Sequence, residues 1–255
     1  MKVKDLLNHI DTFAPFALSE EWDNPGLMIG SYDAEVSRIA ICLDAVSEAV
    51  MLAHENNCNV LLCHHPLIFR GVKKINLDSE FGRTVRAAIM NDINIIAAHT
   101  NWDKADGGVN DTLANLLGLR ECERLDDFGV IGKMPEKMKS EKFFAHVKSS
   151  WNLSHIDIYT QSMPEYISRV ALCGGSGSSF WHSALRHKAD VYITADMKYH
   201  ELIDATREGL TIANLNHGEM ERASLPELAK RISECGTETV ILNVNALNEP
   251  IRIQE

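Results

Sequence analysis

The stretch RIAICLDAVSEAVMLAHENNCNVLLCHHP, residues 38–66, holds two short apolar runs on either side of a helical pattern. The runs RIAICLD (38–44) and NVLLC (59–63) are each typical of a buried strand, because apolar residues fill nearly every position. Between them, Val46, Val50 and Ala53 recur at the spacing that places them on one face of a helix. This alternation of strand and helix predicts an α/β fold.

The same alternation continues after this stretch. Residues 79–92 predict a helix that Ser79 caps and that turns Phe81, Val85 and Ile89 inward. INIIAA (93–98) predicts a third strand. A further helix is expected over residues 109–117, and it should end at Gly118.

The middle of the chain predicts a second lobe. FGVIGKM (128–134) is typical of a strand that Pro135 breaks, and a helix (140–151) and a half-exposed strand (155–161) follow. RECERLDD (120–127) is almost entirely polar, which indicates a lobe boundary. We therefore expect one lobe of residues 1–125 with 205–255, and a second of residues 126–204.

Three later segments repeat earlier ones at an offset of about 120–130 residues. RVALC (169–173) is similar to RIAIC (38–42), and ADVYITADMKYHE aligns with CNVLLCHHPLIF. LTIANLNHGEME aligns with INIIAAHTNWD, and in both an acidic residue lies four positions after a histidine. The pattern predicts an internal duplication.

The net charge argues against a nucleic-acid partner. There are 25 Lys and Arg residues against 36 Asp and Glu, which gives a formal charge of −11. A protein that binds a phosphate backbone presents a basic face. Such a face would have to be gathered from scattered residues such as Lys73, Lys74, Arg83, Lys188 and Arg207.

The sequence also predicts a cytoplasmic protein without a membrane partner. No apolar stretch reaches the roughly 18 residues that a membrane span needs. The N-terminal segment MKVKDLLNHIDTFAPF has apolar residues at helical spacing, interrupted by polar ones, unlike a signal peptide. The six cysteines show no C-x-x-C spacing and fit small core residues in a reducing compartment.

Three clusters of possible metal ligands follow three predicted strands. In open α/β sheets, ligands bind at the carboxyl ends of the strands, where side chains from several strands converge. The five strongest candidates exceed the three protein ligands of a catalytic zinc site, and they suit two ions roughly 3.5–4 Å apart. Zn, Mn, Fe, Ni and Mg fit equally. The clusters are His64 with His65, His99 with Asp103, and His217 with Glu221.

The adjacent histidines need a local explanation, because neighbours in a regular strand point to opposite faces. Pro66 ends the ladder, so we expect the backbone to leave the strand at His64 and His65, each of which could then face a different ion. His217 and Glu221 share one face if this segment is a helix, and a turn would also bring them to one point.

Six motifs resemble, in order, those of the GTP cyclohydrolase I type 2 homologues, also called the Nif-three-like family. They are EEWDNPGLMIG (20–30), CHHPLIF (63–69), AAHTNWD (97–103), GGSGSSF (174–180), DVYITADMKYHE (190–201) and HGEME (217–221). The resemblance implies a three-layer α/β protein of two intertwined, pseudo-symmetric lobes, without the inserted central domain of longer members. It also implies a dinuclear metal site in the cleft and a ring-shaped homohexamer.

Residue roles carry over from the same resemblance. The metal ligands fall on His64, His65, Asp103, His217 and Glu221, with Glu221 or Asp103 as a possible bridge. His99 matches a position close to the metals, where it would act as a catalytic proton-transfer group, and direct ligation stays open.

Other residues near the motifs receive weaker expectations. Glu219 is expected to be a solvated carboxylate at a helix start, with metal ligation as the alternative. His200 either contacts substrate or lies on the surface. CGGSGSS is a tight turn or, beside metals, a cradle for phosphate. Asp23 and Asn24 are expected to form hydrogen bonds within their loop, and Trp22 is expected to pack rather than stack on a base.

Two functions fit this pattern. The first is a metal-dependent hydrolase, in which a metal-activated water attacks a small-molecule substrate such as a nucleotide, and His99 moves the proton. The family name implies GTP as that substrate, while phosphoesters and amides suit the same chemistry. The alternative is a metal-binding, ring-shaped scaffold that recruits a partner without turnover.

Overall fold

The computed structural model describes residues 1–244, which divide into two compact units. Unit 1 comprises Met1–Asp106 and the described residues from Leu225 onward, and unit 2 comprises Gly107–Ser224. The boundaries at 125/126 and 204/205 expected from the sequence both lie inside unit 2. None of the helices in residues 1–244 combines the length and the apolar character that crossing a bilayer requires.

Unit 1 is built on a five-stranded sheet with the order β1-β4-β3-β2-β11. Strands β11, β2, β3 and β4 are parallel, and the edge strand β1 is antiparallel to β4. The parallel strands are apolar at nearly every position because helices cover both of their faces. The bounds are β1 Gly26–Ile29, β2 Ile39–Asp44, β3 Val60–His65, β4 Asn94–Ala97 and β11 Thr239–Ile241.

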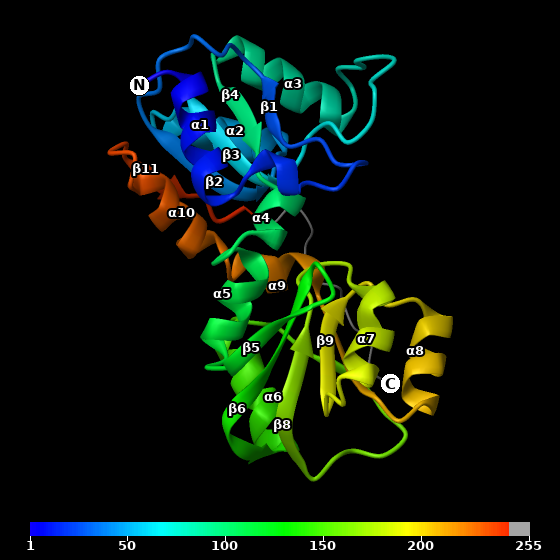
Figure 1. Cartoon of the computed structure of the whole chain (residues 1–255). Helices are drawn as coiled ribbons and strands as arrows, with labels where there is room; N and C mark the ends of the chain where they lie inside the picture. The colour runs from blue at the N-terminus through cyan, green and yellow to red at the C-terminus, as the bar shows by residue number, and fades with distance from the viewer. Residues whose placement is uncertain (245–255) are drawn as a thin grey trace. The chain divides into compact units, whose positions relative to one another are not determined.

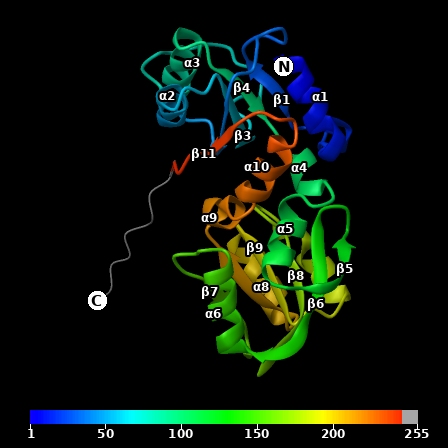
Figure 2. The same ribbon diagram turned by 90° about the vertical axis from the view of Figure 1, so that its left-hand side faces the viewer.

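Helices lie on both faces of this sheet (Figures 1 and 2). α2 and α3 cover one face, where Ala49, Val50, Ala53 and Ala88 pack with the strands, and α1 and α10 lie on the other. The expected inward position of Ile89 is wrong: the side chain is 63% exposed, because the buried stripe of α3 runs through Val85 and Ala88. The helices are α1 Val3–Phe13, α2 Ser47–Glu55, α3 Glu80–Met90, α4 Thr100–Lys104 and α10 Leu225–Ser233, with a 3-10 turn, η1, at Phe16–Leu18.

Unit 2 is built on a six-stranded sheet with the order β5-β6-β8-β9-β10-β7. β8, β9 and β10 are parallel, and the other strands are antiparallel to their neighbours. Figure 1 shows α7 and α8 on one face, where Trp181, Ala184 and Ala205 pack with the strands. The strands are β5 Arg120–Leu125, β6 Gly129–Lys139, β7 Asp157–Tyr159, β8 Tyr166–Leu172, β9 Val191–Ala195 and β10 Thr211–Leu215.

The remaining helices of unit 2 complete its layers. α5 and α6 contact β6, and α6 also contacts β8, while α9 follows β10 directly. The bounds are α5 Val109–Leu116, α6 Ser140–Ser150, α7 Trp181–Arg186, α8 Tyr199–Arg207 and α9 His217–Arg222, with a 3-10 turn, η2, at Ser178–Phe180.

Two local expectations are corrected in unit 2. The polar segment 120–127 is not a boundary: most of it is the edge strand β5, whose side chains are mainly exposed, so that a polar sequence is tolerated there. Pro135 does not end its strand either. β6 runs past it, and the pairing with β8 shifts register between Lys133 and Met138, which removes the need for an N–H at the proline.

Candidate metal centre

His64 and His65 are the last two residues of β3 in unit 1. The expectation that the backbone leaves the strand at these residues is wrong, because His65 still pairs in register with Asp44 of β2. Their rings nevertheless approach, with centroids 5.0 Å apart. The strand stops directly before Pro66, as expected.

Each of these imidazoles is oriented by an oxygen at or just past the end of a neighbouring strand. His64 Nδ1 lies 2.9 Å from the carbonyl oxygen of Ala98, just after β4. His65 Nδ1 lies 2.7 Å from Asp44 Oδ1, at the end of β2. Because both partners are acceptors, Nδ1 carries the proton and donates, and Nε2 presents its lone pair. Metal-binding histidines are commonly held in this way.

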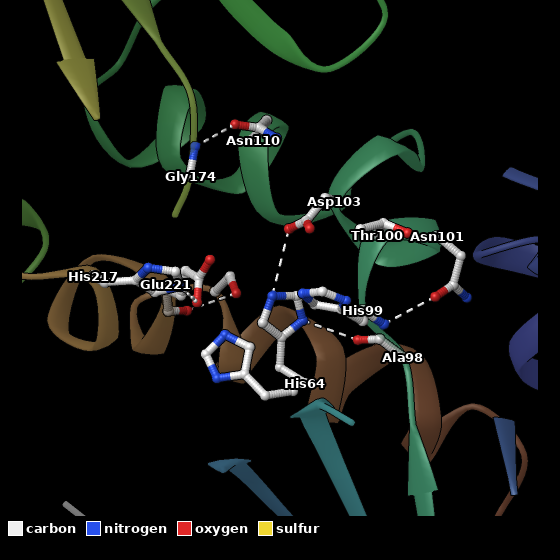
Figure 3. A network of polar contacts seen from close by, with 12 residues as sticks. His64, Ala98, His99, Thr100, Asn101, Asp103, Asn110, Gly174, His217 and Glu221 are labelled. Atoms are coloured by element: carbon white, nitrogen blue, oxygen red, sulfur yellow. Dashed lines mark hydrogen bonds and ion pairs between the residues drawn. The ribbon is translucent and has the colours of Figure 1, made fainter. Parts of the chain in front are cut away.

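Two further ligand candidates of unit 1 come from α4 and the residue before it. His99 precedes the helix, and Asp103 lies within it, buried. Asp103 Oδ1 is 3.5 Å from His64 Nε2. A dashed line joins the two side chains in Figure 3. One ligand atom each from His64, His65 and His99 lies within 4.8 Å of the other two, close enough to surround one ion.

Asp23 orients His99. Its Oδ1 accepts a hydrogen bond from His99 Nδ1 at 2.8 Å, and its Oδ2 accepts bonds from the backbone N–H and hydroxyl of Thr100. Burial raises the pKa of Asp23, but the hydrogen bonds from His99 and Thr100 outweigh it and lower the pKa to about 2. The expected hydrogen bond within the loop is present, since the N–H of Asn24 donates to Asp23 Oδ1 at 2.7 Å. The bonds from His99 and Thr100, 76 and 77 positions away, were not predicted.

His99 itself is held as a neutral base. Burial lowers its pKa, the hydrogen bond from Nδ1 to Asp23 opposes that effect, and the neighbouring imidazoles of His64 and His65 lower the pKa further. A neutral imidazole with Nδ1 donating to a carboxylate leaves Nε2 able to bind a metal or accept a proton.

Unit 2 carries its own histidine–carboxylate pair. His217 and Glu221 are both on α9, which shows that this segment is a helix rather than a turn, with Asn216 capping it through the N–H of Glu219. His217 Nε2 lies 3.0 Å from Glu221 Oε2, and His217 Nδ1 lies 2.7 Å from Asp196 Oδ2. That His217 and Glu221 bind the same ions as His64, His65 and Asp103 stays a prediction.

The glycine-rich segment packs against this pair. Gly175 has a φ of +64°, and a Cβ there would lie 2.3 Å from Glu221 Oε1. Only glycine allows both this backbone conformation and this approach. The N–H of Gly174 donates to Asn110 Oδ1 at 2.7 Å, and Figure 3 marks this bond with a dashed line. The N–H of Gly177 donates to Thr194 Oγ1. These amides bind protein oxygens, which favours the tight turn over the phosphate cradle.

Two other expectations are wrong. Glu219 is buried rather than solvated, and its Oε2 accepts hydrogen bonds from the backbone N–H and hydroxyl of Ser154. Trp22 does not pack in the interior, since 60% of its surface is exposed. His200 is exposed on α8, which fits the surface alternative.

The sequence reasoning missed Asp44 and Asp196 as partners of the histidines. Asp44 ends β2 and Asp196 directly follows β9, so each lies at the carboxyl end of the strand beside the one that leads to its histidine. An acidic residue at the end of an apolar run was the available signal. Each partner lies 21 positions before its histidine, one strand–helix–strand step away.

Curated proteins resemble this chain over nearly its whole length. A protein of Clostridium perfringens named GTP cyclohydrolase 1 type 2 homolog is 34% identical over 242 residues, which cover 92% of each chain. A protein of the same name from Clostridium acetobutylicum is 30% identical over 264 residues, which cover 100% of this chain and 96% of the relative.

Solved structures share the fold. A Bacillus cereus protein related to NIF3 has a TM-score of 0.91 at 24% identity, with 100% of this chain and 99% of that chain covered. Reduced HcgD from Methanocaldococcus jannaschii has a TM-score of 0.84 at 28% identity, with coverage of 96% and 98%. A sequence model of Duf34/NIF3 (NGG1p interacting factor 3) matches residues 1–249. The chain therefore belongs to the Duf34/NIF3 family.

Proposed function

We propose that this protein is a metal-dependent hydrolase whose two divalent ions are bound by His64, His65, Asp103, His217 and Glu221. One observation supports the metals most directly. His217 donates from Nδ1 to Asp196, yet its Nε2 lies 3.0 Å from a carboxylate oxygen of Glu221. In the neutral imidazole, both facing atoms are acceptors and repel each other, so a cation between them or a proton on the ring is needed.

The pair in unit 1 has the same character. His64 donates from Nδ1 to Ala98, and its Nε2 faces Asp103 Oδ1 at 3.5 Å, with both side chains buried. Burial makes such an arrangement of acceptors unfavourable unless positive charge compensates it. Five ligands of histidine and carboxylate type, divided over two ions, leave coordination positions for water and substrate.

The chemistry that divalent ions supply in such sites is a lowered pKa for bound water and stabilisation of developing negative charge. The residues of the chain perform the remaining tasks. Asp44, Asp196 and the carbonyl of Ala98 fix the rings of His65, His217 and His64. Asp23 holds the ring of His99, whose neutral Nε2 accepts a proton, and the Asp23 carboxylate stabilises the imidazolium that then forms.

The substrate class rests on the relatives. The curated relatives are named GTP cyclohydrolase 1 type 2 homolog. We therefore place a nucleotide or similar small molecule first among the substrates, with phosphoesters and amides next.

A scaffold role is the second candidate. The family description reads NGG1p interacting factor 3, which names an interaction rather than a reaction. In that case, the metals would have a structural role, and a ring-shaped homohexamer, which the family resemblance implies, would recruit a partner. The common strand order of the two sheets, β2-β3-β4 flanked by β1 and β8-β9-β10 flanked by β7, supports the internal duplication that a pseudo-symmetric protein needs.

Elemental analysis followed by turnover measurements tests the proposal. The wild-type protein should bind close to two divalent ions per chain and hydrolyse at least one member of a panel of nucleotides, phosphoesters and amides. The His64→Ala/Asp103→Ala variant should lose both properties, whereas His54→Ala, which removes an exposed histidine of α2, should lose neither. A stoichiometry well below two ions contradicts the dinuclear site, and retained metal without turnover favours the scaffold.

A further inference from the structure

We propose that Trp22 and Phe69 bind a flat heteroaromatic ring of the substrate beside His99. This inference names the substrate class and the residues that recognise it, and it rests on the proposed function for the identity of the reacting site. Both residues belong to loops of unit 1, Trp22 before β1 and Phe69 after β3.

The two rings form an exposed aromatic pair. Trp22 is 60% exposed and Phe69 is 44% exposed, whereas Trp102, Trp151 and Trp181 are all buried. The rings of the pair are nearly parallel, with an interplanar angle of 15° and centroids 6.5 Å apart. This separation is near the upper limit for two rings in contact, so the pair has aromatic surface left for a third ring.

The loops that carry the pair are anchored, so the exposure does not come from loose chain ends. Asn24 Nδ2 donates to the carbonyl oxygen of Ile68 at 2.7 Å, which ties the two loops together one or two residues from the rings. On the other side of Trp22, Asp23 is fixed by His99 and Thr100, and Glu20 forms an ion pair with Lys104. Preorganised aromatic surface of this kind binds a ligand with little loss of conformational entropy.

The pair is directed at the reacting site. The centroid of Phe69 lies 5.4 Å from that of His99 at an angle of 87°, and the centroid of Trp22 lies 6.0 Å from that of His99 at 72°. A ring that stacks on Trp22 or Phe69 therefore lies next to the imidazole that we assign to proton transfer. Stacking on aromatic side chains is how proteins hold bases without hydrogen-bond readout.

The charge near Phe69 favours an anionic substituent on that ring. Residues 66–77, PLIFRGVKKINL, contain Arg70, Lys73 and Lys74 and no acidic residue. All three cations are exposed, in a chain whose net charge is −11. A phosphorylated heteroaromatic molecule would find both of its parts matched within this one loop.

Equilibrium titrations of the full-length, metal-loaded protein with three probes separate ring recognition from phosphate recognition. Guanosine 5′-monophosphate has a ring and a phosphate, guanosine only the ring, and ribose 5-phosphate only the phosphate. Trp22→Leu and Phe69→Leu keep apolar bulk but remove the aromatic face. Each variant should lower the affinity for both guanosine-containing probes by about 5- to 150-fold, the range typical of base stacking. The affinity for ribose 5-phosphate should stay unchanged.

Controls distinguish stacking from general surface effects. Trp22→Phe should restore most of the affinity, and Tyr32→Leu, which removes an aromatic ring of 59% exposure elsewhere in unit 1, should have no effect. Since Trp22 is the exposed tryptophan, ring probes should quench the protein fluorescence and ribose 5-phosphate should not. The inference is overturned if wild type binds the ring probes no more tightly than ribose 5-phosphate. It is also overturned if the leucine substitutions lower the affinity for all three probes equally.

The same titrations separate this inference from the proposed function. The His64→Ala/Asp103→Ala variant should lose metal and turnover but keep fluorescence quenching by guanosine, because Trp22 and Phe69 are unchanged. If wild type shows no turnover while ring binding still depends on both aromatic residues, the hydrolase fails and the ring site stands. If turnover is found and is insensitive to Trp22→Leu and Phe69→Leu, the ring site fails and the hydrolase stands.

Discussion

The candidate ligand histidines are oriented by hydrogen bonds to residues that the sequence alone does not identify. The histidines could be found from their places after apolar runs, because strand ends converge at one edge of a parallel sheet. Their partners Asp44 and Asp196 could not be assigned, because pairing depends on which strands are neighbours and in which register. The exposure of Trp22 was also beyond the sequence, since burial depends on what the loop before β1 packs against.

Asp44→Asn should weaken metal binding at His65. The amide no longer favours the Nδ1-protonated ring as a carboxylate does, so the orientation and basicity of the imidazole are lost, which typically lowers metal affinity by about 10- to 100-fold. Competition with a chromogenic chelator measures this affinity. Asp33→Asn, which alters a surface carboxylate paired with Lys4, is the control, and equal affinities in both variants would argue against the assigned role of Asp44.

Gly175→Ala should destabilise the protein and disturb Glu221. A left-handed backbone at alanine costs about 1–2 kcal/mol, and the new Cβ would also overlap Glu221 Oε1. Gly118→Ala is matched for backbone, with a φ of +73° and no atom within 4 Å of the added Cβ. Urea unfolding should show a greater loss of unfolding free energy for Gly175→Ala than for Gly118→Ala. Metal binding should be weaker in Gly175→Ala alone. Identical behaviour of the two variants would contradict the close packing.

At the level of elements, apolar periodicity was sufficient for most helices and strands. Parallel strands that helices cover on their faces leave a continuous apolar run in the sequence. This run was the signal that predicted β2, β3, β4, β8, β9 and β10. The edge strand β5 was missed for the opposite reason, since an exposed edge places few demands on side chains. The two predicted boundaries differ from those of the compact units, because β5 and β10 join the sheet of unit 2 by pairing with β6 and β9.

The contribution of the contact between α2 and α3 to stability should fall at acidic pH because Glu80 becomes protonated. Hydrogen bonds from Ser47, then from Arg83, lower the Glu80 pKa to about 2. In the unfolded chain, the pKa of a glutamate is about 4.3. Because the folded value is the lower one, this contribution to stability is complete above about pH 4.3 and is lost as the pH falls toward 2.

Glu80→Gln should therefore unfold with a flatter pH dependence than wild type between about pH 4.3 and pH 2. Thermal unfolding over this range provides the measurement. Glu55→Gln, which changes an exposed carboxylate at the end of α2, serves as the control. If Glu80→Gln and wild type lose stability in parallel over this range, the carboxylate of Glu80 does not stabilise the helix pair.

For the whole molecule, the proposed ligands come from both units: His64, His65 and Asp103 from unit 1, and His217 and Glu221 from unit 2. The sequence predicted these residues from three separate segments, but it could not assign them to units, because the boundary depends on long-range strand pairing. Metals that bind all five residues would bind only the folded chain.

Chelation should accordingly lower the unfolding temperature of the metal-loaded protein. A ligand at 100 times its dissociation constant stabilises the folded state by about 2.7 kcal/mol, and removal forfeits that stabilisation. Differential scanning calorimetry with and without a chelator measures the shift. The His64→Ala/Asp103→Ala variant should not respond. A response of equal size in that variant would assign the stabilisation to metals bound elsewhere.

Unit 2 interrupts unit 1 along the chain, and this has a consequence for biosynthesis. During translation, the strands of the six-stranded sheet emerge as one continuous piece, while β2 must wait for β11, which pairs with it about 200 residues later. All of unit 2 therefore emerges from the ribosome before the sheet of unit 1 can be completed. Nascent or prematurely terminated chains that lack β11 present β2 as an open edge, and such edges recruit other chains into aggregates.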